Sequence, residues 1–402
     1  MENPKIRFKG FTKDWEQRKF GDVVQVRRGL TYKPSDVQET GVRVLRSSNI
    51  NEDTFVCGND DVFVNPKTVN IDTVKQNDIL ITSANGSSRL VGKHALIKGI
   101  PDESAVHGGF MLLGITKNYD FINASMNSSW YIRFINIYVT GGNGAIGNLS
   151  KSDLDEQLIL VPSDLEQKKI GEYFTNLDHL ITLHQRKCEQ TKNLKKYMLQ
   201  KMFPQNGAKV PEIRFNGFTH DWEQRKLSEL LEKYEDPVET PHDGYERVGI
   251  RSHAKGTFHS FVEPGKELDT AKMYRVAADK FILNITFAWE HAVAITDNND
   301  AGKLVSHRFP QFSFNPKLKP HFFKYLMLDK KFREHLELSS PGGAGRNRVL
   351  KISDMLKYEI KLPSIEEQIK IGEYFDSLDN LITLHQRQTD FYKKPNFYFI
   401  SS

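Results

Sequence analysis

Hydrophobic residues along the chain follow two periods, and each period marks a different kind of element. Between residues 167 and 203, apolar side chains recur at three- and four-residue steps, and Ile170, Leu177, His184, Thr191 and Met198 lie seven apart. This spacing predicts one amphipathic helix with a single seam. About 38 helical residues span roughly 57 Å at 1.5 Å per residue, which is too long for one small domain, so the helix is expected to act as a spacer.

A second helix of the same kind is predicted near the end of the chain. Pro162-Ser163-x-x-Glu166 and Pro363-Ser364-x-x-Glu367 both read as capping boxes, in which serine accepts from a backbone N–H and glutamate reaches back. The second helix is expected to stop by Pro395, which leaves it shortened at its C-terminal end. Because both helices carry the same apolar face, we expect them to pack antiparallel with pseudo-two-fold symmetry. The alternative is that each is an ordinary core helix of its own domain.

Shorter apolar runs, bounded by turn residues, predict strands that are followed by one helix. In the first half these strands are Val23–Val26, Val42–Leu45, Asp78–Thr82, His94–Ile97 and Phe110–Ile115, with a helix over about Ala124–Tyr138. In the second half they are Arg247–Ile250, Phe281–Phe287, Ala292–Ile295 and Gln311–Phe314, with a helix over about His321–Leu338. Each helix ends at a glycine-rich loop, at residues 141–144 and 342–345. Both halves are therefore expected to share one α/β (α+β) fold.

Two sequence blocks occur twice, in the same order. Residues 4–19 and 211–226 are identical at thirteen of sixteen positions, and residues 162–186 and 363–387 at nineteen of twenty-five. The segments between these blocks share little. Repeated frames with different inserts indicate frames that bind the same partner and inserts that read different targets. We predict four segments: a first domain with its insert (1–161), a first spacer helix (162–204), a second domain with its insert (205–362) and a second spacer helix (363–402).

Composition narrows the class of protein only modestly. The net charge of +5 is compatible with a nucleic-acid partner without requiring one. Two cysteines are too few for a disulfide framework, no apolar run is long enough to cross a membrane, and residues 1–10 lack an apolar signal core. We therefore expect a cytoplasmic location.

Polar and basic clusters in the loops of both inserts are the candidate DNA contacts, because Arg, Lys, Asn and Ser read base edges and bind phosphates. In the first insert these residues are Arg27, Arg28, Arg46, Ser47, Asn49, Asn85, Ser87, Arg89 and Lys93. In the second they are Arg251, Ser252, His253, Lys255, Arg346, Asn347 and Arg348, near the Trp289-Glu290-His291 cluster. Arg46-Ser47 and Arg251-Ser252 follow a predicted strand at similar points and form the best matched pair. Each residue alone is readily explained as a solvated loop side chain, whereas the recurrence of clusters in both inserts favours recognition.

No segment that resembles a catalytic motif has all the residues that the motif requires. The segment from Gly86 to Lys93 resembles a phosphate loop but has five residues between its glycines instead of four, and His94 follows where Ser or Thr should bind magnesium. No adenine-methylation motif and no Cys/His set with zinc spacing is present in the sequence. His184 and His385, in identical LITLHQR contexts, are expected to be packed histidines. We therefore predict no catalytic residues and no metal site.

The order of these repeated blocks resembles the specificity subunits of type I restriction-modification systems. The resemblance is carried by KIRFKGFTKDWEQRK and EIRFNGFTHDWEQRK, by Pro162-Ser163 and Pro363-Ser364 with the Glu-Gln pairs after them, and by the IGEYF…LITLHQR continuation. It implies a non-catalytic subunit that binds a bipartite DNA target, in which the domains 1–161 and 205–362 are target-recognition domains that each read one half-site. It also implies docking of two methylation subunits and two restriction subunits, which would use S-adenosylmethionine, ATP and Mg²⁺.

Two other readings remain open at this stage. One is an enzyme, either a nuclease or a methyltransferase, fused to recognition domains; incubation of the pure chain with DNA, magnesium and a labelled methyl donor distinguishes it. The other is a coiled-coil scaffold that binds only protein; a gel shift at rising salt distinguishes it, because phosphate contacts weaken steeply with salt.

Overall fold

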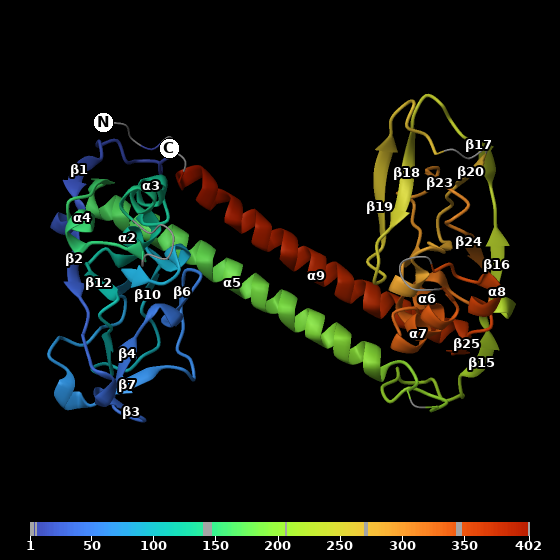
Figure 1. The fold of residues 1–402 in the computed structure, drawn as a ribbon, viewed down its shortest axis with the longest axis horizontal. Coiled ribbons are helices and arrows are strands. Elements are labelled where there is room, and N and C mark those ends of the chain that lie inside the picture. Colours follow the sequence, from blue (N-terminus) through green and yellow to red (C-terminus); the bar gives the residue numbers. More distant parts are fainter. Residues whose placement is uncertain are drawn as a thin grey trace. The chain divides into compact units, whose positions relative to one another are not determined.

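The computed structural model describes residues 4, 6–139, 147–205, 207–268, 272–342 and 348–400, with side chains up to residue 393 (Figure 1). The chain forms two compact units, Met1–Gln185 with Gln386–Ser402, and Arg186–His385. Each long helix contributes one part to each unit, so this division cuts through both helices. The four predicted segment boundaries stay a prediction.

In each unit, a two-stranded ribbon joins the two repeated sequence blocks. In unit 1, β1 (Glu16–Lys19) pairs antiparallel with β14 (Leu158–Val161), and in unit 2, β15 (Glu223–Lys226) pairs antiparallel with β25 (Glu359–Leu362). The register is the same, because Glu16 faces Val161 and Glu223 faces Leu362. The strand of one block thus contacts the strand that leads into the other block.

A four-stranded sheet with the same strand order forms the centre of each unit. In unit 1 its order is β10 (His94–Leu96), β8 (Ile79–Thr82), β12 (Met111–Ile115), β2 (Gln25–Arg28). In unit 2 its order is β22 (Val293–Ile295), β21 (Phe281–Leu283), β24 (Gln311–Phe314), β16 (Leu231–Tyr234). The central strands β8 and β21 are buried throughout, as expected for strands covered on both faces. The predicted common fold of the two inserts is confirmed.

Each unit also has a second sheet. The two second sheets share an arrangement of three strands and differ in the strands outside it. In unit 1 its order is β11 (Ala105–His107), β4 (Val42–Leu45), β7 (Val62–Val64), β3 (Val37–Gln38). In unit 2 its order is β17 (Pro237–Glu239), β20 (Lys272–Arg275), β23 (Leu304–Val305), β18 (Tyr245–Ile250), β19 (Thr257–Val262). In both, β4 or β18 lies between a parallel neighbour, β11 or β23, and an antiparallel neighbour, β7 or β19. Two short pairs complete unit 1: β5 (Ile50–Asn51) with β6 (Thr54–Phe55), and β9 (Ala84–Asn85) with β13 (Gly147–Asn148).

The single helix expected after each sheet is in fact two helices. Unit 1 has α2 (Tyr119–Ser125) and α3 (Ser129–Tyr138), and unit 2 has α6 (Pro320–Leu326) and α7 (Lys330–Leu338). The break has a local cause, since Asp329 takes an extended conformation and its side chain accepts from the Lys331 N–H as the cap of a new helix. Three short helices, α1 (Phe20–Val23), α4 (Lys151–Asp155) and α8 (Ile352–Met355), lie beside the two-stranded ribbons in sequence.

The long helices begin inside the two hydrophobic cores. α5 (Asp164–Lys201) has the expected 38 residues, and its Ile170 lies in the core around Phe20 and Phe134. α9 (Ile365–Ile400) places Ile371 and Phe375 in the phenylalanine-rich core of unit 2. The expected stop by Pro395 was wrong, because α9 continues to Ile400. A proline inside a helix removes one backbone hydrogen bond and crowds the carbonyl four residues earlier, which weakens or kinks a helix without always ending it.

Within each unit, the two long helices lie side by side. In unit 2, Cys188 Sγ is 3.9 Å from the Ile382 carbonyl oxygen, and Lys195 Nζ is 2.5 Å from Asp379 Oδ1. The residue number falls on one helix as it rises on the other, so the pairing is antiparallel, as predicted. In unit 1 the ring of His184 stacks on Tyr392 at 5.7 Å. The prediction that His184 is a packed histidine is therefore confirmed. No helix in the described part of the chain has the length and apolarity required to cross a bilayer.

A buried arginine–glutamate pair fixes each entry segment to a long helix. Arg7 donates from Nε and Nη2 to the two carboxylate oxygens of Glu166, both at 2.8 Å, and Arg214 does the same to Glu367 at 2.7 and 2.8 Å. The two glutamates are 1% and 0% exposed. Only the serine half of the predicted capping box is present at Ser364, which accepts from the Glu367 N–H at 3.3 Å, while the Glu367 side chain binds Arg214 instead of reaching back. Both glutamate side chains bind an arginine of the other repeated block, a role that the sequence pattern did not predict.

The next residues of the repeat fix the insert to the same helix. Gln167 accepts from Asn118 Nδ2 at 2.6 Å, and Gln368 accepts from the backbone N–H of Lys319 at 2.9 Å. Four residues later, a glycine allows α2 or α6 to approach closely: a Cβ on Gly171 would lie 2.7 Å from Asp120 Cβ, and one on Gly372 would lie 3.0 Å from His321 Cβ. The repeated motif is therefore the point at which entry segment, insert and long helix meet.

Candidate nucleic-acid interface

In the first domain, two predicted clusters come together beside the end of β4. Arg46 follows the last residue of this strand, and its Nη2 donates to the carbonyl oxygen of Asp60 at 2.6 Å. Ser47 Oγ accepts from Asn85 Nδ2 at 2.9 Å. Residues that are far apart in the sequence thus form one polar surface, as the prediction requires.

This surface borders an open cleft of about 810 Å³ whose other wall is largely apolar. Phe110 lies in the cleft with 68% of its surface exposed. Its position is fixed by its backbone, because its carbonyl oxygen accepts from the N–H groups of Ser83 at 2.9 Å and Ala84 at 3.1 Å. Large exposed aromatic side chains in a cleft are typical of binding surfaces.

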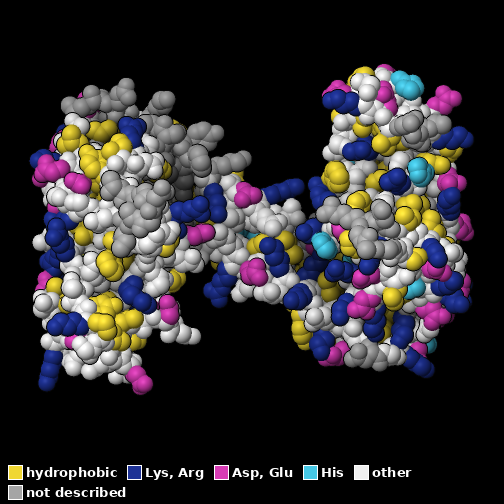
Figure 2. Space-filling view, in the orientation of Figure 1, with side chains coloured by type: hydrophobic (Ala, Val, Ile, Leu, Met, Phe, Trp, Pro, Cys, Tyr) yellow, Lys and Arg dark blue, Asp and Glu magenta, His cyan; other side chains and the backbone are white. Residues whose placement is uncertain are grey.

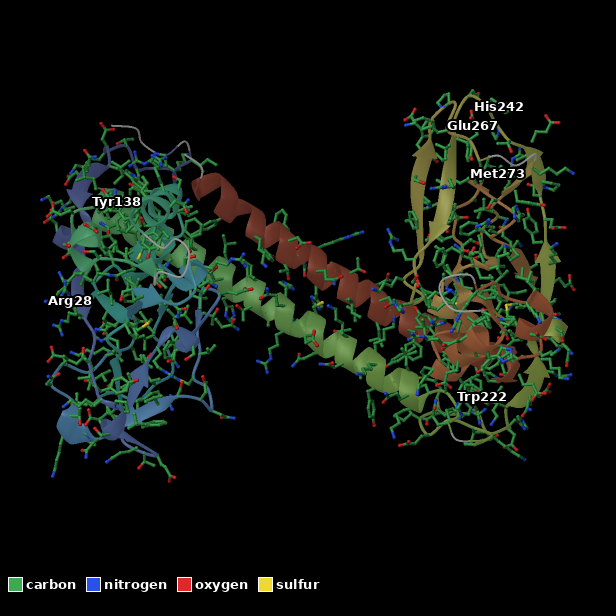
Figure 3. All side chains as sticks on the ribbon, in the orientation of Figure 1. Arg28, Tyr138, Trp222, His242, Glu267 and Met273 are labelled. Carbon is green, nitrogen blue, oxygen red and sulfur yellow. The ribbon has the colours of Figure 1, made fainter. Side chains whose placement is uncertain are left out.

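The other predicted residues of the first domain have different environments. Ser87 and Arg89 are exposed on the loop that follows Asn85, and Lys93 is half-buried where that loop ends. Arg27 forms an ion pair with Asp72, and Arg28 is exposed at the margin of unit 1 in Figure 3. Neither arginine is among the residues that line the cleft.

Asn49 does not contribute to the surface. It is 1% exposed, its Nδ2 donates to Val56 O and Asp61 Oδ1, and its Oδ1 accepts from the Arg46 N–H. The side chain therefore supports the turn that positions Arg46, and a contact with DNA would require this turn to open. We leave Asn49 out of the proposed surface.

In the second domain, the turn after β18 is attached to the Trp289-Glu290-His291 segment. Ser252 Oγ donates to Glu290 Oε2 at 2.7 Å, and the backbone N–H of His253 donates to the Glu290 carbonyl at 2.9 Å. His253 has a φ of 62°, in the left-handed region, so this attachment holds a tight turn that presents exposed His253 and Lys255. The guanidinium of Arg251 lies 5.2 Å above the Phe258 ring and donates to the Thr257 carbonyl.

The third cluster of this insert reaches the same place. Arg348 lies 5.4 Å above the Trp289 ring, and its Nη1 is 3.4 Å from Glu337 Oε1. Arg346 and Asn347 lie outside the described residues, as do the glycine-rich loop at 141–144 and most of the one at 342–345. The described part of the second insert thus unites the three clusters that the sequence suggested.

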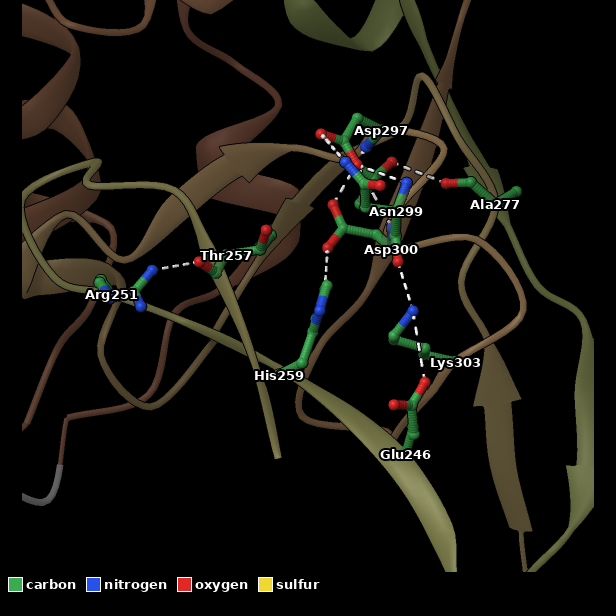
Figure 4. Close-up of polar contacts among 10 residues, drawn as sticks. Glu246, Arg251, Thr257, His259, Ala277, Asp297, Asn299, Asp300 and Lys303 are labelled. Atoms are coloured by element: carbon green, nitrogen blue, oxygen red, sulfur yellow. Dashed lines mark hydrogen bonds and ion pairs between the residues drawn. The ribbon is translucent and has the colours of Figure 1, made fainter. Parts of the chain in front are cut away.

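The hairpin that carries Arg251 is anchored along its length (Figure 4). His259 Nε2 lies 2.8 Å from the buried carboxylate of Asp300, and Lys303 Nζ lies 3.4 Å from Glu246 Oε2. These contacts join β18 and β19 to the loop before β23. Arg251 is therefore presented from a rigid element, which suits a residue that must match a base edge.

The matched pair chosen from the sequence has equivalent positions in the two domains. Arg46 and Arg251 each follow the last residue of the corresponding strand of the second sheet, β4 or β18. Ser47 and Ser252 each bind a residue 38 positions later, Asn85 or Glu290. Both domains have an arginine and a serine at these positions. The residue that the serine binds is an asparagine in the first domain and a glutamate in the second.

Sequence reasoning missed two residues of these surfaces, Phe110 and Arg308. Phe110 was assigned to a strand, but the strand begins at Met111. Arg308 is exposed, and its carbonyl oxygen accepts from the Ile285 N–H at 3.0 Å, much as Phe110 accepts from Ser83. Both are the third residue after the short parallel strand, β11 or β23, which would have been the signal had those strands been recognised.

The buried histidines near these surfaces are enclosed by protein atoms, and this burial determines their pKa values. Burial lowers the pKa of His107 and of His291 to about 4, so both are neutral at physiological pH. His291 also contacts the Met327 carbonyl at 2.9 Å. Within the described ranges, no three His, Cys, Asp or Glu side chains are placed to hold a metal ion. On the face shown in Figure 2, basic and acidic side chains are interspersed on both units, consistent with the modest net charge.

Comparison with known proteins identifies the family. The model of the type I restriction modification DNA specificity domain matches residues 12–193 and 219–390. The MjaX type I restriction enzyme specificity subunit of Methanocaldococcus jannaschii is 25% identical over 405 residues, covering 94% of this chain and 89% of the relative. The MjaVIII specificity subunit of that organism is 25% identical over 268 residues, which is 62% of each chain.

The fold is also found in a solved structure. The S subunit of a type I restriction-modification system from M. genitalium superposes with a TM-score of 0.58 at 12% identity, covering 99% of this chain and 98% of that one. Because the family model matches both halves and most of the sequence, the chain belongs to the type I restriction-modification specificity subunits, which recognise DNA sequence and are not themselves catalytic.

Proposed function

We propose that this subunit binds a bipartite duplex target and that each domain reads one half-site. The reading surface lies at the end of β4 in the first domain and at the end of β18 in the second. The observation that supports this most directly is the equivalent placement of Arg46 and Ser47 in one domain and Arg251 and Ser252 in the other. Two domains that read different DNA sequences require the same arginine surrounded by different residues. An arginine that reads guanine contributes about 1–3 kcal/mol of discrimination.

We further propose that the repeated frame docks two methylation subunits and, through them, two restriction subunits. The buried Arg7–Glu166 and Arg214–Glu367 pairs give both frames the same local geometry, so that one kind of partner meets the same site twice. S-adenosylmethionine, ATP and Mg²⁺ would then be used by those partners, in the cytoplasm. The paired helices would set the gap between half-sites, at roughly one helical turn of 10–10.5 bp.

The test is methylome sequencing of cells that express this chain with its partner subunits. The expected result is one bipartite motif with a fixed gap. The Arg251→Ala variant should relax a base in one half of the motif and leave the other half unchanged. Equal loss in both halves would contradict the assignment of one half-site to each domain.

A second experiment separates recognition from a purely protein-binding scaffold. The purified chain with its methylation partner is titrated with a duplex carrying the motif and with a scrambled duplex, at several salt concentrations. We expect the scrambled duplex to bind more weakly and both affinities to fall steeply with salt. Equal binding of both duplexes would refute sequence recognition by this complex.

A further inference from the structure

At one equivalent position of their candidate surfaces, the first domain carries an apolar residue and the second carries a basic one. In the first domain, the Leu149 N–H donates to Ser83 O, and the Ser83 N–H donates to Phe110 O. In the second, the Leu350 N–H donates to Ile285 O, and the Ile285 N–H donates to Arg308 O. Leu149 and Leu350 occupy the same place before the short helices α4 and α8. The same series of backbone hydrogen bonds occurs in both domains, so Phe110 and Arg308 occupy equivalent positions.

The cleft around Phe110 is suited to an apolar group rather than to a phosphate. Among the described residues that line it, the one arginine is Arg46, which has the Asp60 carboxylate 3.7 Å away, so their charges offset each other. Tyr32, Val37 and Met111 line it together with Phe110. A phosphate seeks uncompensated positive charge, which these residues do not supply.

In the major groove, only thymine presents an apolar group, its C5-methyl, and phenylalanine is one of the side chains that contact it. Arginine, by contrast, donates to O6 and N7 of guanine. We propose that Phe110 reads the C5-methyl of a thymine in the first domain's half-site, and that Arg308 reads a guanine at the corresponding place in the second. This inference rests on the proposed function, since it requires each domain to read one half-site.

The test uses the duplex identified by methylome sequencing, with deoxyuridine replacing each thymidine of the first half-site in turn. The first half-site is the one that Arg251→Ala leaves unchanged. Deoxyuridine lacks only the C5-methyl group. We expect one substitution to weaken binding of the complex of this chain with its methylation partner about fourfold, which corresponds to about 0.8 kcal/mol for one buried carbon.

The Phe110→Ala variant shows whether Phe110 is the group that senses the methyl. Its affinity should be reduced, and thymidine and deoxyuridine should now bind equally well at that position. Phe110 is exposed, so truncating it is not expected to disturb the fold. If the variant keeps the full preference for thymidine, Phe110 is not the reader and the inference fails.

The second domain provides the matched control. Replacing one guanine of the second half-site by 7-deazaguanine, which lacks the N7 acceptor, should weaken binding, and Arg308→Ala should abolish that difference. Phe110→Ala should leave this response unchanged. A first half-site without thymine, or one in which no deoxyuridine has an effect, overturns the inference while specific binding to both half-sites leaves the proposed function intact. Loss of all sequence preference would instead overturn the proposed function.

Discussion

The buried pair between Arg214 and Glu367 should be essential to the stability of unit 2. Arg214→Met removes the guanidinium and keeps a side chain of similar length. Glu367 is fully buried and would lose two hydrogen bonds of 2.7 and 2.8 Å from a charged donor. Each such bond contributes roughly 1.5–3 kcal/mol, and breaking a buried ion pair typically costs about 3–5 kcal/mol. We expect the free energy of unfolding of this unit to fall by about 3–5 kcal/mol.

Native-state hydrogen exchange measures this loss separately in each unit, which a single unfolding curve of a two-unit chain does not. Amides of β15 and β25 should exchange more than about a hundredfold faster, since 1.4 kcal/mol corresponds to a factor of ten. Amides of β1 and β14 should be unaffected. Arg7→Met is the matched variant and should show the reverse pattern, because Arg7 binds Glu166 in the same geometry.

A double variant distinguishes the charge from the shape of this site. Arg214→Met combined with Glu367→Leu removes both charges, and replacing both partners of a buried pair by apolar groups is often nearly neutral. We expect exchange of β15 and β25 to return most of the way to that of the parent protein. An increase of less than tenfold in the single variant, or no recovery in the double variant, would refute the reasoning.

Three further perturbations have expected outcomes. Gly171→Ala should destabilise unit 1 by about 1–3 kcal/mol, because its Cβ would lie 2.9 Å from the backbone nitrogen of Phe121. Gly372→Ala should destabilise unit 2 less, since its nearest backbone neighbour is 3.3 Å away, and native-state hydrogen exchange of each unit checks this order. Stability should fall as pH drops from about 6.5 to about 4, by up to about 3 kcal/mol each for His107 and His291, because the unfolded state binds a proton that the buried neutral rings do not. Urea titrations of the whole chain at several pH values test this, and His291→Gln should reduce the total change. Deleting seven residues from both α5 and α9 should change the gap length in the methylated motif, and an unchanged gap would show that these helices do not set it.

The elements that the sequence predicted well are those whose cause is local. A seven-residue seam defines α5, and short apolar runs between turn residues define β4 and β24. The bounds of both strands agree with the structure, and those of α5 agree within three residues. The three-residue strand β11 and the two-residue strand β23 were missed, because so short a segment has no period of its own. Their strand conformation comes from pairing with β4 and β18, which are distant in sequence.

The candidate surfaces were predicted as sets more successfully than as individual residues. Arginine and serine after a strand were recognisable because the pattern occurred twice. Asn49 and Asn85 look alike in the sequence, yet one is buried in a turn and the other lines the cleft, since only the fold determines which amide is enclosed. Phe110 was taken for a strand residue because an apolar side chain beside an apolar run carries no sign of exposure.

The pattern of repeats follows from which atoms make the contacts. Within the frame, Arg7 and Glu166 interact through side chains, so both ends must be kept, and both ends lie in repeated blocks. Between frame and insert in unit 2, Gln368 binds the backbone of Lys317 and Lys319, and Gly372 accommodates the backbone of α6. Backbone atoms are the same whatever the insert's side chains are. In unit 1 the equivalent glutamine, Gln167, accepts instead from the side chain of Asn118. The backbone contacts of unit 2 therefore let its insert change nearly all of its side chains while the frame still holds it in the same place, whereas the insert of unit 1 must also keep an amide donor for Gln167.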